Sequence, residues 1–88
     1  MLRDIHKKMR ECTLNDKMME RLQRHKVPED TAKQILIEFW KSDLVATGIH
    51  PDLPAVCYED TYQDLLWVGV KVIAKPILQE NHPKTFIW

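Results

Sequence analysis

The stretch YEDTYQDLLWVGVKVIAKPIL, residues 58–78, decides the fold, because it contains a nearly unbroken apolar run. The apolar part, residues 65–74, is interrupted by Lys71 and is only half as long as the roughly 20 residues that a membrane-spanning helix needs. We therefore exclude a membrane anchor. A strand, a core helix and a docking surface are the alternatives that remain.

The residue types and the flanking charges of this segment favour different structures. Three valines alternate with Gly69 and Lys71, which is a spacing typical of a strand. Acidic residues before the run and lysines near its end complement a helix dipole, and Pro76 follows where a helix would end. We predict a helix over residues 59–75, with a strand as the alternative, and we expect Gly69 to mark a close approach between helices.

A helix at this position would be apolar around most of its circumference, so we expect it to be buried at the centre of a small bundle. The predicted core residues are Ile35, Leu36, Phe39, Leu65, Leu66, Val72 and Ile73.

Apolar residues at spacings of three and four predict three further helices, over residues 2–11, 14–25 and 28–45. Thr13 and Asp16 resemble a capping box at the start of the second of these helices. Pro28, followed by two acids, favours the start of the third. The sequence leaves open whether the first two helices are continuous.

Length and composition bound the architecture. The chain has 88 residues, which suffices for one domain, and its two glycines and five prolines are too few for an all-β sandwich or barrel. Two prolines and a glycine between residues 48 and 54 predict a loop over 48–57. We predict one mainly α domain over residues 1–88, a bundle of about four helices with an extended C-terminal tail.

Charge is balanced overall but uneven along the chain. The formal net charge is zero, whereas residues 1–26 carry +4, residues 27–70 carry −6 and the remainder carries +2. The N-terminal excess predicts a basic face, which is either solvated or complementary to an acidic partner or a second copy. The residues assigned to this face are Lys7, Lys8, Arg10, Arg21 and Arg24.

No cofactor or metal is predicted. The two cysteines, Cys12 and Cys57, and the four histidines form no short ligand pair of the kind that zinc sites use. The charged N-terminal segment lacks the apolar region of a secretory signal, so we expect an intracellular, cytoplasmic protein.

Catalysis is not expected either. His50, Asp52 and Cys57 lie near one loop, but their spacing matches no nucleophile motif. Asp60 and Asp64 share a helix face, as metal-binding carboxylates do, yet charge at a helix N-terminus explains them more simply. We predict that the protein is not an enzyme.

Two kinds of binding function are considered. Residues 19–40 have the layout of a helix-turn-helix, but the first turn of its second helix carries Glu29 and Asp30, which phosphates repel. DNA binding is therefore the alternative hypothesis.

The leading hypothesis is a protein-interaction module, a regulator or inhibitor of the kind that compact phage and plasmid genomes encode. The tail residues Phe86, Ile87 and Trp88 are large and apolar, so we expect them to dock, either on the chain's own helices or on a partner.

Overall fold

The computed structural model describes residues 13–45 and 48–87, so the helix expected at 2–11 lies outside the described residues. The prediction of a mainly helical fold is confirmed, and the described residues contain no strand. The expected count of about four helices is not confirmed. The helices of the described chain are α2 (Leu14–Arg24), α3 (Glu29–Lys41), the short 3-10 helix η1 (Ala55–Cys57) and α4 (Asp60–Asn81).

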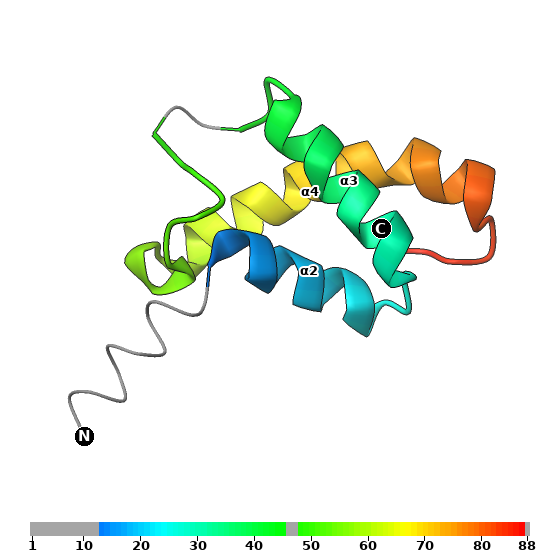
Figure 1. The fold of residues 1–88 in the computed structure, drawn as a ribbon, viewed down its shortest axis with the longest axis horizontal. Helices are drawn as coiled ribbons and strands as arrows, with labels where there is room; N and C mark the ends of the chain where they lie inside the picture. The colour runs from blue at the N-terminus through cyan, green and yellow to red at the C-terminus, as the bar shows by residue number, and fades with distance from the viewer. Residues whose placement is uncertain (1–12, 46–47, 88) are drawn as a thin grey trace.

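Helix α3 packs against both α2 and α4 and is the middle element of the bundle. Figure 1 shows α4 extended along the longest direction of a molecule that measures 45 × 26 × 19 Å. The segment after α3 runs back to the start of α2, where η1 leads into α4 (Figure 1). Backbone N–H groups of Leu14 and Asn15 donate to carbonyls of Leu53 and Pro51, so this loop satisfies donors in the first turn of α2.

Both ends of α2 follow from local sequence. The Thr13 hydroxyl accepts the N–H of Asp16 at 3.2 Å, which is the N-terminal cap that the sequence indicates. At the other end Lys26 has a positive φ of 64°, and the N–H of Val27 donates to the carbonyl of Leu22 at 3.2 Å. This is a Schellman motif without glycine, and the chain turns there into α3.

Helix α3 ends four residues earlier than the predicted limit of residue 45. The Ser42 hydroxyl donates to the carbonyl of Phe39 at 2.6 Å, and the Ser42 N–H bonds the same oxygen. The backbone at Ser42 is extended, so the helix cannot continue. The apolar residues after Ser42 belong to the loop that follows α3 and do not continue the helix.

Helix α4 runs through Pro76, so the prediction that the helix ends there is wrong. Proline inside a helix costs roughly 3 kcal/mol, because it lacks an N–H and crowds the carbonyl four residues earlier. Packing beyond the proline offsets this cost: Leu78 is fully buried and Ile77 packs on the core. Thr31 Oγ1 and His82 Nε2 lie 3.1 Å apart, which ties the end of α4 to α3.

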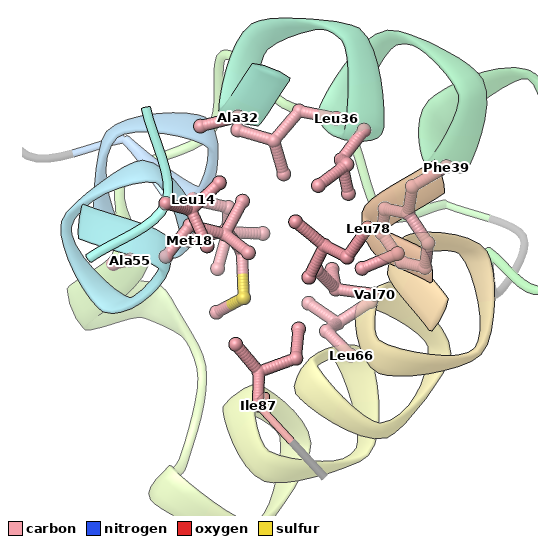
Figure 2. Close-up of a cluster of buried hydrophobic side chains, with 14 residues drawn as sticks. Leu14, Met18, Ala32, Leu36, Phe39, Ala55, Leu66, Val70, Leu78 and Ile87 are labelled. Carbon is pink, nitrogen blue, oxygen red and sulfur yellow. The ribbon is translucent and has the colours of Figure 1, made fainter. Parts of the chain in front are cut away.

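The core is one cluster of buried apolar side chains between the helices, and Figure 2 shows side chains from all of them converging. Ile35, Leu36, Phe39 and Leu66 are buried, as predicted. The assignment of Leu65 and Val72 to the core is wrong, because both are more than half exposed. The other residues of α4 in the cluster are Val70, Ala74 and Leu78.

Gly69 marks a close contact between α4 and α3. A Cβ placed on Gly69 would lie 2.7 Å from Cε1 of the fully buried Phe39, so α4 and α3 touch at this point and a side chain has no room. The close approach expected at Gly69 is thus confirmed. The buried side of α4 is formed by Leu66, Val70, Ala74 and Leu78, and Leu65 and Val72 lie outside it.

The end of the chain returns to the core. Beyond α4 the described residues form a turn, and Ile87 is only 6% exposed, with its side chain pointing into the cluster (Figure 2). The separate extended tail of the prediction is not confirmed. Ile87 therefore docks on the chain's own helices, whereas Phe86 is 63% exposed.

Candidate interaction surface

The outward face of α4 carries a row of exposed apolar side chains. Leu65, Val68 and Val72 are 63%, 51% and 56% exposed, and their spacing of three and four places them on one face of the helix. We name these three residues the α4 stripe. Such a row differs from scattered surface leucines, because its members adjoin along a single helix.

The apolar surface extends from the α4 stripe to the loop after α3. Leu44 and Tyr62 are also about half exposed, and both line a small hollow of about 80 Å³ together with Leu65. The Cβ of Leu44 lies 3.5 Å from the position that a Cβ on Gly69 would occupy, so this loop lies against α4. The stripe is thus the centre of a wider apolar area.

Charged residues lie along one flank of the stripe, with acids at one end and lysines at the other. Asp60 and Asp64 lie toward the start of α4, and Lys71 and Lys75 lie toward its end. Their separations of four, seven and four residues keep all of them on one side of the helix. The flank is therefore acidic at one end of the stripe and basic at the other.

The described part of the predicted basic face is engaged within the chain. Arg21 donates to Asp64 Oδ1 at 2.9 Å, and its guanidinium carbon lies 5.5 Å from the ring centroid of Trp67. Arg24 pairs with Glu20 at 2.7 Å on the same helix. These contacts hold Arg21 against α4, so it joins α2 to the charged flank of the stripe.

The remaining predicted contact residues do not form one site with these arginines in the described chain. Lys7, Lys8, Arg10 and Trp88 lie outside the described residues. Ile87 is part of the core, and Phe86 is the exposed member of the described tail. Their role in partner binding stays a prediction.

A second concave feature lies between α2 and α3. It is an open groove of about 700 Å³ that includes Met19, Leu36 and Trp40 among its lining residues. Four of its polar side chains pair with each other: Trp40 Nε1 donates to Asn15 at 3.2 Å, and Lys33 lies 3.7 Å from Glu29. No buried side-chain polar atom of the described residues lacks a hydrogen-bond partner, so the groove has no unsatisfied buried group aimed at a small ligand.

Residues 13–45 and 48–87 contain no cluster of three or more His, Cys, Asp or Glu side chains suited to a metal ion. His50 instead accepts the N–H of Asp52 at its Nδ1, at 3.2 Å, and Cys57 is exposed. Among the described helices, none is long and apolar enough to cross a membrane.

Comparison with known proteins found no matching family model, no matching curated protein and no matching solved structure.

Sequence reasoning missed the α4 stripe because it counted Leu65 and Val72 as core. One signal could have identified it. Leu66, Val70, Ala74 and Leu78 recur at a strict spacing of four, and this series continues past Pro76. This series, which includes the small residue Ala74, indicates the core face and leaves Leu65 and Val72 outside it.

Proposed function

We propose that this protein is a small protein-interaction module whose binding surface is the α4 stripe. The observation that carries the proposal is the exposure of Leu65, Val68 and Val72 on a helix whose opposite face is fully packed. Exposed contiguous apolar surface of this kind costs solubility and is typical of contact sites. The protein would act as a regulator or inhibitor by occupying another macromolecule, without catalysing a reaction.

Nucleic-acid binding through α2 and α3 has less support from the surface. The exposed charged residues of α3 are Glu29, Asp30 and Glu38 against Lys33 and Lys41, which leaves a net negative face. Phosphate backbones attract the opposite charge. The stripe itself is apolar and flanked by equal numbers of acids and lysines, which suits a protein surface better.

The proposal is tested by affinity capture with a matched pair of variants. Leu65→Gln removes the most exposed residue of the α4 stripe, and Ile37→Gln removes an apolar residue of α3 that is 53% exposed. Both are expected to fold, because neither residue is buried. Captured proteins should be lost with Leu65→Gln and retained with Ile37→Gln, in the presence of nuclease.

Equal capture by both variants would refute a role for the stripe. Capture that disappears on nuclease treatment would instead support the nucleic-acid alternative. Identified partners are then titrated by calorimetry, where Leu65→Gln should weaken binding at least tenfold, as expected for a residue at the centre of an interface.

A further inference from the structure

We infer that the partner of the α4 stripe is a second copy of this chain, with the two α4 helices packed antiparallel about a two-fold axis near Val68. The inference rests on the proposed function and identifies the partner that binds the stripe. The formal net charge of zero means that two copies do not repel each other over long distances. The order of residues along α4 favours this pairing.

The apolar residues of the stripe are self-complementary in the antiparallel direction. A two-fold axis brings the same patch of both copies together, so a residue on the axis faces its own equivalent. With Val68 at the axis, the position opposite Leu65 is one residue away from Val72 of the second copy, so these two side chains adjoin. Three apolar layers are thereby covered on each copy without a change in either helix.

The charged flank selects the same direction and the same register independently. In antiparallel packing of two identical helices, equivalent flanks meet. Asp64 then faces Lys71 of the second copy and Asp60 faces Lys75, in a register that agrees with the valine pairing to within one residue. In parallel packing the charged flank of each copy would instead meet the opposite flank of the other, so these acid–lysine pairs would not form.

The contact between Arg21 and Asp64 is compatible with this arrangement. Arg21 bonds one oxygen, Oδ1, and the Asp64 side chain remains 67% exposed. A carboxylate has about four acceptor positions, so it can bind Arg21 and a lysine together. The flank that faces the second copy is thus partly fixed in place by α2 before association.

Association is expected to be weak and dependent on concentration. The contact involves one helix of 22 residues from each copy, extended at its side by Leu44 and Tyr62. Interfaces below about 1,200 Å² of total buried area are typical of transient complexes, for which dissociation constants near the micromolar range are common.

Sedimentation equilibrium of the full chain, from about 10 μM to about 1 mM, measures this association across the expected range. The wild-type chain should pass from monomer to dimer. Val68→Gln places two amides at the axis and should weaken the dimer at least tenfold, while Ile37→Gln should not. Circular dichroism melting confirms that each variant is folded.

A charge exchange tests the direction of packing. Asp60→Lys with Asp64→Lys should weaken self-association, as should Lys71→Glu with Lys75→Glu, and mixing the two variants should restore the dimer. Asp30→Lys with Glu38→Lys on α3 changes the net charge equally away from the stripe, so it controls for general repulsion. Sodium chloride should reduce the difference between the variants.

Several outcomes would overturn the inference. A monomer at every concentration, or a dimer that Val68→Gln leaves intact, excludes self-association through the stripe. Exchanged charges that have no more effect than the α3 control exclude the antiparallel register. A monomer that still captures another protein through Leu65 leaves the proposed function standing and refutes only self-association, whereas loss of both refutes the proposed function as well.

Discussion

The two faces of α4 are built from the same residue types and do different things. Leu66 is 4% exposed and Leu65, its neighbour in the chain, is 63% exposed. Hydrophobicity therefore does not distinguish the face that forms the core from the face that is left outside. What separates them is the rotation of the helix, which places Leu66, Val70, Ala74 and Leu78 in the core and leaves Leu65 outside.

Truncating Leu65 and Leu66 in turn should separate the two faces most clearly. Leu66→Ala should lower the free energy of unfolding by about 2–5 kcal/mol, because it removes buried atoms and leaves a cavity. Leu65→Ala should change it by no more than about 0.5 kcal/mol, as is usual for a surface position. Urea denaturation of the two variants measures the difference. Comparable losses at both positions would mean that α4 is rotated so that Leu65 also lies in the core.

The core face also depends on a residue from the end of the chain. Ile87→Ala should lower the free energy of unfolding by about 1.5–3 kcal/mol, the contribution of burying a large apolar side chain. Thermal melting of the monomer at low concentration measures this loss of stability. Phe86→Ala is the control, because the Phe86 side chain is mainly exposed. A melting temperature unchanged by Ile87→Ala would show that the terminal segment does not stabilise the core.

The contact between α4 and α3 can be tested at Gly69. Gly69→Ala should destabilise the fold by about 1–3 kcal/mol through overpacking against Phe39, even though alanine favours a helix by about 1 kcal/mol. Phe39→Leu in the same chain should recover part of this loss, because the ring atom nearest the new methyl group is removed. A double-mutant cycle gives the coupling between the two positions. Additive effects would contradict a direct contact.

Much of this fold is predictable from the sequence, for identifiable reasons. The start of α2 at Thr13 and the acidic start of α3 are signalled locally, by a capping hydroxyl and by charges that complement a helix dipole. The helical structure of residues 65–74 is likewise indicated by flanking charges, against the strand preference of the valines. These features involve residues close together in the chain.

The features that were not predicted depend on contacts between distant segments. Pro76 remains inside α4 because the residues beyond it pack on the core. The outward position of Leu65 and Val72 depends on which side of α4 meets α3, and an apolar pattern on most of a helix does not specify this. For the same reason the sequence indicates the basic residues and the tail as the candidate surface, whereas the exposed stripe lies in the segment expected to form the core.

The smallest expected effects concern the two arginines that connect α2 to charged partners. Arg21 combines a salt bridge to Asp64 with a position over Trp67, and its side chain is 29% exposed, so Arg21→Ala should destabilise the monomer by about 1 kcal/mol. Arg24 makes an exposed pair with Glu20, so Arg24→Ala should cost no more than about 0.5 kcal/mol.

Because salt screens the exposed pair more fully, the Arg24 effect should vanish at 1 M sodium chloride while part of the Arg21 effect persists through packing on the indole. Chemical denaturation by urea at low and high salt measures both. An Arg21 effect that vanishes with salt as completely as that of Arg24 would mean that its contact with Trp67 contributes nothing, and that the charged flank of the exposed face is not anchored by α2.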